Sequence, residues 1–181
     1  MELPVLEDIA VCDLAIEPMA LFDKRWFLLT AGDFAAGRYN TMTISWGSFG
    51  TVWNKPFVQV FCRPQRYTFN FMESFDSFTL CTFRPAYRSA LQLLGSRSGR
   101  VCNKIAEAGL TPMASRSVAA PGFAEAELIV ECKKIYAQPM DPQGFKDGTI
   151  DSNYPSQDYH HIYFGEISLI RGSADYVKRQ V

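Results

Sequence analysis

The stretch that decides the fold is NTMTISWGSFGTVWNKPFVQVFCRPQRYT, which runs from Asn40 to Thr68. Over Asn40–Trp46, polar and apolar residues alternate with a period of two, the pattern of a half-buried strand. A second strand is predicted over Ser48–Trp53 and a third over Pro56–Cys62, with a turn at Asn54-Lys55 between them. The third is rich in Val and Phe, which is typical of a strand buried on both faces.

The segments outside this stretch extend the pattern. A change of period over Gln65–Phe75 predicts a helix directly after the third strand. Five to seven strands with a few helices between them indicate a mainly β fold, an antiparallel barrel with helical decoration. The irregular stretch from Pro139 to Tyr159 is long enough to be a functional lid or an arm that reaches a partner. The other predicted elements are strands over Arg25–Ala31, Ser77–Phe83, Glu127–Ala137 and Ile162–Arg171, and helices over Ala86–Leu94 and from about Val101 to Glu107.

The composition favours one globular unit and excludes several function classes. A chain of 181 residues with 48% hydrophobic content can bury a full core as one domain, residues 1–181. The net charge of −1 excludes a global field that recruits nucleic acid or an anionic membrane. No run approaches the roughly 18 apolar residues of a membrane span. The N-terminal sequence MELPVLEDIAVCDL carries acids where a secretory signal carries lysines, so a cytoplasmic location is expected.

The cysteines and histidines do not have the spacing of a metal site. There is no CxxC pair, and His160 and His161 are adjacent. A zinc or iron–sulfur centre is therefore not expected, and the cysteines are interpreted as reduced, mostly buried thiols. They are Cys12, Cys62, Cys81, Cys102 and Cys132.

The first predicted strand has a row of small hydroxyls on one face. One interpretation is an edge-exposed strand, because threonine favours strands and hydroxyls tolerate water. The other is a ligand contact, because hydroxyls beside a strand's free backbone groups offer donors and acceptors to the polar rim of a flat heterocycle. Alternation places Thr41, Thr43 and Ser45 on one face and Asn40, Met42, Ile44 and Trp46 on the other.

The turn after the third strand brings positive charge to a predicted helix start. A proline at this place, Pro64, leaves the amides of the first helical turn facing outward, where they attract an anion. Arg63 and Arg66 would clamp a phosphate with forked hydrogen bonds, and Thr68 would add a hydroxyl. The alternative is an ordinary solvated arginine pair. A ligand with both a flat polar ring and a phosphate, such as flavin mononucleotide (FMN), accounts for the turn and the hydroxyl row together.

A third basic segment, Gly95-Ser96-Arg97-Ser98-Gly99-Arg100, is followed by Lys104. It lacks the Gly-Lys-Ser/Thr ending of a phosphate-cradling loop and no strand leads into it, so a nucleotide triphosphatase is disfavoured. The segment is either a flexible link with a solvated positive face or a source of Arg97, Arg100 or Lys104 for the flavin, from the same or a partner subunit. The sequence has neither the G-x-S-x-G of a serine nucleophile nor a strand-led G-x-G-x-x-G.

Five blocks in this order resemble the flavin reductase-like proteins, which share the FMN-binding split β-barrel and include flavoredoxin. The blocks are N-T-M-T-x-S-W, W-N-K-P, R-P-x-R-Y-T, S-G-R-x-x-x-K and H-x-x-Y-x-G-E-I, and the match extends from about Trp26 to Ile167. The resemblance implies a homodimer of Greek-key barrels with FMN in a groove near the subunit interface. The residues it implies are Asn40, Thr41, Met42, Thr43, Ser45 and Trp46 beside the ring and ribityl chain, Arg63, Pro64, Arg66, Tyr67 and Thr68 on the phosphate side, and in addition Lys104 and His161.

The resemblance also implies an activity. NAD(P)H would bind transiently over the flavin and pass hydride to it, and the electrons would go on to an unidentified acceptor; no catalytic side chain is expected. Two alternatives stay open. One is a flavoredoxin-type electron carrier that is reduced by a partner protein, and the other is a non-enzymatic barrel dimer that binds heme or a different flavin. The basic side chains that either form a docking patch or serve the phosphate are Arg84, Arg88, Arg97, Arg100 and Lys104.

Overall fold

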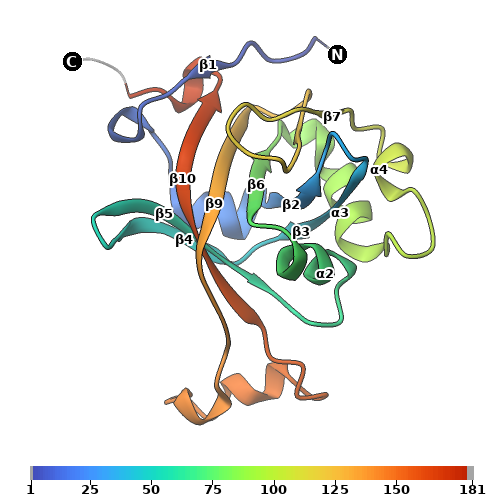
Figure 1. Ribbon diagram of the computed structural model, residues 1–181, viewed down its shortest axis with the longest axis vertical. Helices are drawn as coiled ribbons and strands as arrows, with labels where there is room; N and C mark the ends of the chain where they lie inside the picture. Colours follow the sequence, from blue (N-terminus) through green and yellow to red (C-terminus); the bar gives the residue numbers. More distant parts are fainter. Residues whose placement is uncertain (1, 179–181) are drawn as a thin grey trace.

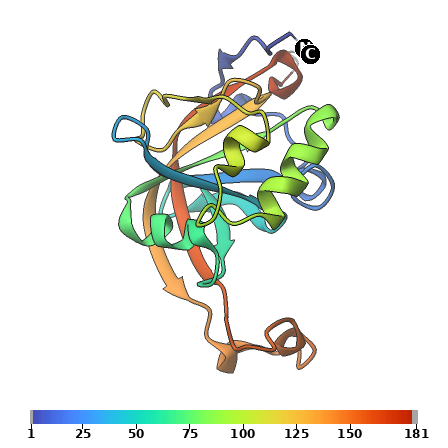
Figure 2. The ribbon, with the colours of Figure 1, turned by 90° about the vertical axis from the view of Figure 1, so that its right-hand side faces the viewer.

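A computed structural model describes residues 2–178 and confirms the expected antiparallel barrel with helical decoration. One antiparallel sheet curls on itself (Figures 1 and 2), with strands in the order β3-β2-β6-β9-β10-β5-β4 and with β1 paired to β10. The strands are β1 (Glu7–Asp8), β2 (Phe27–Asp33), β3 (Arg38–Ile44), β4 (Gly47–Val52), β5 (Lys55–Cys62), β6 (Ser77–Thr82), β9 (Leu128–Pro139) and β10 (His161–Gly172), and a separate small pair, β7 (Pro112–Met113) and β8 (Gly122–Phe123).

The helices are short, and α2 and α3 pack beside β3 and β2. In the described part of the chain, no helix is both long and apolar enough to cross a membrane. The α-helices are α1 (Pro18–Ala20), α2 (Tyr67–Ser74), α3 (Arg88–Ser96) and α4 (Lys104–Glu107). The other helical turns are η1 (Val11–Asp13), η2 (Leu21–Arg25), η3 (Pro85–Tyr87), η4 (Pro142–Gly144), η5 (Ile150–Asn153) and η6 (Ala174–Tyr176).

The sheet is covered on both faces, because successive residues of its central strands point into two different cores. In β2, Phe27 and Leu29 belong to the core inside the barrel, whereas Leu28 packs in the second core with Leu91 and Leu94 of α3. Phe27, Leu28, Leu29 and Leu94 are fully buried. Burying each such side chain stabilises the fold by roughly 1.5–3 kcal/mol, so the second core holds α3 firmly against the sheet.

The predicted strands and helices are all present, with shifted ends. Helix α2 begins at Tyr67 rather than Gln65, because the residue before it, Arg66, keeps an extended backbone after the proline turn. Helix α3 continues past the expected stop at Gly95 to Ser96. The two-residue strands β1, β7 and β8 and the N-terminal helical turns were not predicted, since such short elements leave no periodic pattern.

The segment from Pro139 to His160, here called the arm, extends away from the barrel at the ends of β9 and β10 (Figure 1). It carries η4 and η5 and is otherwise irregular, as expected from its Asp, Gly, Pro and Ser content. His160, the last residue of the arm, packs against Trp46, two residues past the end of β3, and this contact makes the arm part of the site described next.

Candidate functional site

Strand β3 is an edge strand of the sheet and forms one wall of the candidate site. It pairs only with β2, so the backbone groups on its outer side have no partner in the sheet. Two cavities follow it in succession, one beside Asn40 and the other beside the stretch from Met42 to Trp46. The two cavities together, here called the cleft, therefore run along β3 from Gly37 to Trp46 except at the buried Thr41.

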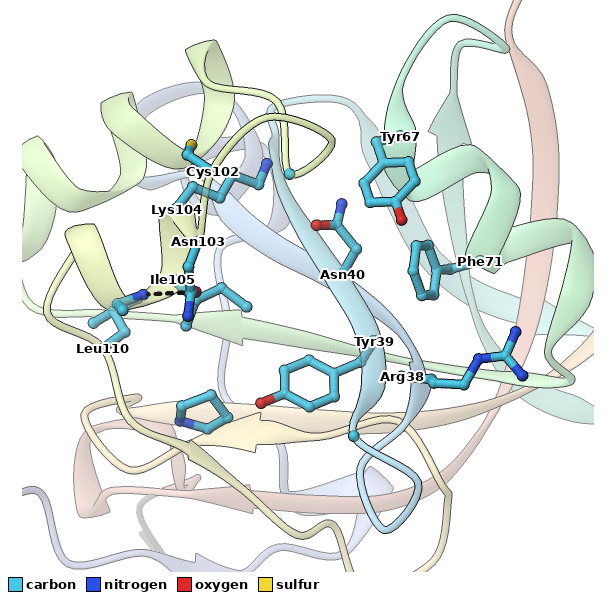
Figure 3. A pocket seen from close by; sticks show the side chains of 14 residues that line it. Arg38, Tyr39, Asn40, Tyr67, Phe71, Cys102, Asn103, Lys104, Ile105 and Leu110 are labelled. Atoms are coloured by element: carbon cyan, nitrogen blue, oxygen red, sulfur yellow. Dashed lines mark hydrogen bonds between the residues drawn. The ribbon is translucent and has the colours of Figure 1, made fainter.

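The first cavity, of about 690 Å³, lies between β3, α2 and α4. Figure 3 shows Lys104 extending toward Asn40, with the rings of Tyr67 and Phe71 on the opposite wall. The loop before α4 approaches so closely that a Cβ on Gly99 would overlap the side-chain oxygen of Asn40 and lie 3.1 Å from the Tyr67 ring. This loop therefore fits only with glycine at that position.

The second cavity, of about 290 Å³, brings the hydroxyl strand and the arginine-bearing turn together. Its lining joins segments that are separate in the sequence: the end of β3, the end of β5 with the turn before α2, and the last residue of the arm. The residues that line it are Met42, Thr43, Ile44, Ser45, Trp46, Phe61, Arg63, Gln65, Arg66 and His160.

The hydroxyl row is divided between the fold and the cleft. The Thr41 hydroxyl is fully buried and donates to the carbonyl of Leu29 at 3.1 Å. The Thr43 hydroxyl donates to the carbonyl of Leu91 at 2.5 Å. Only Ser45 is exposed. The predicted single face of free hydroxyls is therefore not formed in this structure, because the first two hydroxyls satisfy buried carbonyl groups.

Cationic side chains lie between the two cavities, and two of them, Arg66 and Lys104, donate hydrogen bonds only to backbone carbonyl groups. Arg66 donates to the carbonyl of Gly95, near the C-terminal end of α3. Lys104 donates to the carbonyls of Leu94 at 2.9 Å and Arg97 at 3.1 Å. Within residues 2–178, neither cation has a carboxylate partner. Both are therefore able to exchange a neutral carbonyl for an anion.

Burial gives Lys104 an unusual proton affinity. Its removal from water and, to a smaller extent, the nearby positive charge of Arg66 lower the pKa of the ammonium group to about 8. Arg66 and Lys104 donate to the carbonyls of two consecutive residues, Gly95 and Leu94, so both charges lie at the C-terminal end of α3. Arg100 adds a third cation at the rim, where it donates to the Gln65 carbonyl at 3.0 Å and lies 5.0 Å from the Tyr67 ring centre.

The turn before α2 divides its residues between the cleft and the interior. Thr68 is buried, and its hydroxyl accepts a hydrogen bond of 2.7 Å from the Asn40 amide. Pro64 lies in the turn itself and lines neither cavity. No side chain caps α2 at Arg66, so the first amides of the helix stay unsatisfied by side chains. The contact between Thr68 and Asn40 links the helix start to β3.

The far end of the cleft is aromatic. Trp46 is 48% exposed, and its ring centre lies 4.9 Å from that of His160. The imidazole Nδ1 of His160 is 2.8 Å from the Tyr154 hydroxyl. Burial lowers the pKa of His160 to about 4, and the charge of Arg63 acts in the same direction, so this ring is neutral at pH 7.

The predicted histidine, His161, does not line either cavity. Its ring packs edge-on against Phe69 at 4.7 Å, and its Nδ1 lies 3.8 Å from the carboxylate of Glu73. Neighbouring residues point to opposite sides of an extended chain, so the side chain that reaches the cleft is the adjacent His160. Of the two adjacent histidines, the structure places His160, rather than the predicted His161, on the wall of the cleft.

The arm closes over the same end of the cleft. Asp158 accepts hydrogen bonds from Arg63 at 3.2 Å and from Gln65 at 2.6 Å. Arg63 also donates to the Asn153 carbonyl at 2.6 Å. Of the arginines in this turn, Arg63 is thus held by the arm and Arg66 by α3. A further cavity of about 740 Å³ under the arm shares Trp46 with the second cavity.

The thiols take no part in a metal site. Among residues 2–178, no three His, Cys, Asp or Glu side chains form a group able to hold a metal ion. Cys62, Cys81 and Cys132 are buried, Cys102 is half-buried and Cys12 is exposed, and all are unpaired. Burial raises the pKa of Cys62 to about 12, so this thiol is protonated at neutral pH, and the thiol that lines the cleft is that of Cys102, in the first cavity.

The sequence matches the flavin reductase like domain over residues 19–175, almost the whole chain. The chain belongs to this family. By sequence, no curated protein matches it. The family assignment agrees with the blocks of sequence found in β3, in the turn before α2 and in the loop before α4. These are the segments that meet in the cleft.

Solved structures similar to this flavin reductase-like chain share its fold. An FMN-binding domain of a flavin reductases-like enzyme from Shewanella baltica has a TM-score of 0.69 at 16% identity, over 96% of this chain and 80% of that one. Flavoredoxin of Desulfovibrio vulgaris has a TM-score of 0.65 at 23% identity, over 90% and 73%. Nitrilotriacetate monooxygenase component B from Bacillus cereus has a TM-score of 0.66 at 17% identity, over 93% and 77%.

Proposed function

We propose that this chain, as one unit, binds FMN in the cleft along β3 and acts as an NAD(P)H-dependent flavin reductase. The observation that carries the proposal is the difference between the two parts of the cleft. Toward α3 and α4, Arg66 and Lys104 are held only by carbonyl oxygens. Toward the arm, an exposed Trp46 lies beside the neutral ring of His160. A phosphate suits the first part and a flat ring suits the second.

The residues present fit such a ligand. The cations that have no carboxylate partner would bind the phosphate with charge-assisted hydrogen bonds, which are about twice as strong as neutral ones. The outer backbone groups of β3 would contact the ring and the ribityl chain, together with Ser45. In this arrangement Thr41 and Thr68 act by holding the wall in place, since both are buried. The residues proposed to contact FMN are Asn40, Met42, Thr43, Ser45, Trp46, Arg63, Arg66, Tyr67, Arg100, Lys104 and His160.

The chain's own part in the reaction is to bind and orient. The chemistry that FMN supplies when bound is the acceptance of hydride from a reduced nicotinamide and its transfer onward as electrons. The polar side chains in the cleft have structural partners: the Cys102 thiol donates to the Ser98 carbonyl at 3.6 Å, and the His160 imidazole is hydrogen-bonded to the Tyr154 hydroxyl. Trp46 and Phe61, which line both the second cavity and the one under the arm, offer an apolar surface to a planar partner.

A visible spectrum of the purified full-length chain tests the proposal. We expect yellow protein after addition and removal of excess FMN, and bleaching of the 450 nm region, roughly the flavin maximum, on anaerobic addition of NADH or NADPH. Protein that retains no added FMN would refute the binding proposal. Protein that stays yellow with both nucleotides and bleaches with dithionite would refute the reductase activity and leave an electron carrier of the flavoredoxin type.

We also propose that the functional form is a homodimer in which the arm contacts the partner subunit. Three large aromatic side chains support this, because they remain exposed on the isolated chain: Trp46 at 48%, Trp53 at 59% and Tyr136 at 37%. Deleting the tip of the arm, Gly144–Pro155, should shift the mass measured by light scattering toward the monomer and weaken flavin binding. An unchanged mass together with unchanged flavin affinity would refute this role of the arm.

A further inference from the structure

A separate, smaller cavity of about 200 Å³ lies at the N-terminal end of α3, the opposite end from the cleft. Four of its seven lining residues are cationic, and none is acidic. The apolar part of the wall comes from Phe83 directly after β6, Pro85 of η3 and Leu91 of α3. The residues that line it are Lys24, Arg25, Phe83, Arg84, Pro85, Arg88 and Leu91.

The carboxylates nearby do not balance these charges. Glu127 pairs with both Arg25 and Arg84, the latter at 3.5 Å. Lys24 pairs with its neighbour Asp23 at 2.5 Å, but both side chains are largely exposed, so this pair contributes little. Four cationic side chains against these two carboxylates leave an excess of two positive charges. Arg88 has no carboxylate partner within residues 2–178.

The helix itself adds to the imbalance. The N-terminal end of α3 carries the positive end of the helix dipole, equivalent to roughly half a charge. No side chain caps this end, and no acidic residue lies in the first turn. Helix N-termini normally gather Asp and Glu for this reason, so four cations here are placed against the field of the helix. An anion in the cavity would interact favourably with both the four cations and the positive end of the helix dipole.

Arg88 is already positioned for such a contact. Its guanidinium lies 3.1 Å from the ring centre of Trp26 and donates to the Lys24 carbonyl at 2.7 Å, so only part of its donor set is used. Trp26 has a φ of 69°, a conformation that bulky residues rarely adopt. This backbone places the indole beneath Arg88, and strain of this kind is concentrated at binding and catalytic sites.

We propose that this cavity binds a phosphate dianion. The charge excess of two matches a doubly charged group, and the volume is below the roughly 300 Å³ of an ordinary small-molecule pocket, so it admits a phosphate group rather than a whole nucleotide. The group is either free inorganic phosphate or the terminal phosphate of a larger molecule whose remainder lies outside. The site is separate from the flavin cleft, and the proposal does not depend on FMN binding.

Isothermal titration of inorganic phosphate into the full-length chain tests this proposal at constant ionic strength. The protein is first saturated with FMN, so that the phosphate site of the cleft is filled. We expect one saturable site that Arg88→Gln weakens at least tenfold and that Lys24→Gln weakens less, because Lys24 is more exposed. The control Arg116→Gln removes an exposed arginine elsewhere on the surface and should leave phosphate binding unchanged. Absence of a saturable site, or equal binding by wild type and Arg88→Gln, overturns the proposal.

Two further experiments distinguish free phosphate from the phosphate of a larger molecule, and distinguish this proposal from the flavin proposal. If the phosphate belongs to NADPH, Arg88→Gln raises KM for NADPH severalfold and leaves KM for NADH unchanged; if it is free phosphate, both constants stay unchanged while the titration still responds to Arg88. If the chain retains no FMN, the titration is run on flavin-free protein. If Arg88→Gln then loses phosphate binding and Arg66→Ala keeps it, the phosphate site at α3 is supported although the flavin proposal has failed. If Arg66→Ala loses phosphate binding and Arg88→Gln keeps it, the proposal of a phosphate site at α3 is overturned.

Discussion

Helix α3 has cations at both ends, and the two ends differ in how these charges are satisfied. At the C-terminal end, Arg66 and Lys104 donate to the last carbonyl oxygens of the helix. At the N-terminal end, Arg25 and Arg84 share one carboxylate and Arg88 has none. The first arrangement follows the helix dipole and the second opposes it.

Because of this difference, the cations at the C-terminal end of α3 are favourably placed without a ligand, whereas those at the N-terminal end are not. Cations at the negative end of the dipole are favourable by themselves, so the flavin-side cations keep their positions in the empty cleft and exchange a carbonyl for a phosphate oxygen on binding. Cations at the positive end repel the helix and one another. An anion there contributes to folding as well as to binding, and ligand-linked stabilisation should distinguish the two ends.

The largest effect is expected from Arg66→Ala, at the C-terminal end. Loss of a charged hydrogen-bond partner costs roughly 1.5–3 kcal/mol, so FMN affinity should fall by about 10- to 100-fold. Riboflavin lacks the phosphate and should be affected about threefold at most. Quenching of flavin fluorescence measures both affinities. Arg97→Ala is the matched control, because Arg97 lies at the same helix end but pairs with Glu107 at 4.0 Å. Equal weakening of FMN and riboflavin by Arg66→Ala would contradict a phosphate role.

A smaller loss is expected from Gly99→Ala, in the loop that follows α3. The new methyl group would overlap the side chain of Asn40, so the loop must move away from β3. Such overpacking costs roughly 1–3 kcal/mol of stability, and the displaced loop should also weaken FMN binding. Gly148→Ala is the control, since nothing lies within 4 Å of its added carbon. Urea unfolding of both variants measures the difference, and an unchanged midpoint in Gly99→Ala would show that the loop is free to adjust.

The sequence was sufficient for most of the barrel and for much of the cleft. The period-two stretch at β3 and the apolar run at β5 are local patterns, and the sheet follows from them. The cleft residues on β3 and at the start of α2 were predicted from residue type and from the family resemblance. Arg66 and Lys104 indeed meet at the end of α3, although no local pattern places a residue of the turn beside a residue almost forty positions later.

What could not be predicted depends on register and on distant contacts. His161 was assigned from the family resemblance, but the block H-x-x-Y-x-G-E-I itself begins at His160, the ring that lines the cleft. The ion pair between Asp158 and Arg63 could not be predicted either, because these residues lie far apart in the chain. The unmatched charge of Arg88 is also invisible in the sequence, where Glu127 and the other nearby groups are scattered.

An intermediate effect is expected from Lys104→Met. The preference for FMN over riboflavin should fall about tenfold at pH 7, because one charged contact is lost. In wild type this preference should decline as the pH rises through about 8, where the ammonium loses its proton, and bound phosphate should move the decline to higher pH. The variant should show no decline in this range. A wild-type preference that stays constant from pH 7 to 9.5 would contradict contact between Lys104 and the phosphate.

The same variant gives a prediction for stability. The pKa of Lys104 is lowered in the folded chain from 10.5 to about 8, so between these values the unfolded chain binds more protons. Stability should therefore rise with pH over this window in the flavin-free wild type, relative to Lys104→Met. Urea unfolding at pH 7.5 and 9.5 measures the difference between the two proteins, which cancels the titration of other groups.

The smallest effect is expected from new acids at the two ends of α3, and it tests the comparison directly. Ser89 is an exposed residue of the first turn, so Ser89→Glu supplies the negative charge that this end lacks and should stabilise the chain by about 0.3–1 kcal/mol at low salt. Ser96→Glu adds the same charge at the negative end and should destabilise it by a similar amount. Ser89→Gln and Ser96→Gln are the uncharged controls. Because Ser89→Glu neutralises part of the excess charge, added phosphate should raise the melting temperature of this variant less than that of Ser89→Gln. Equal responses to phosphate would mean that the cations around Arg88 are already balanced.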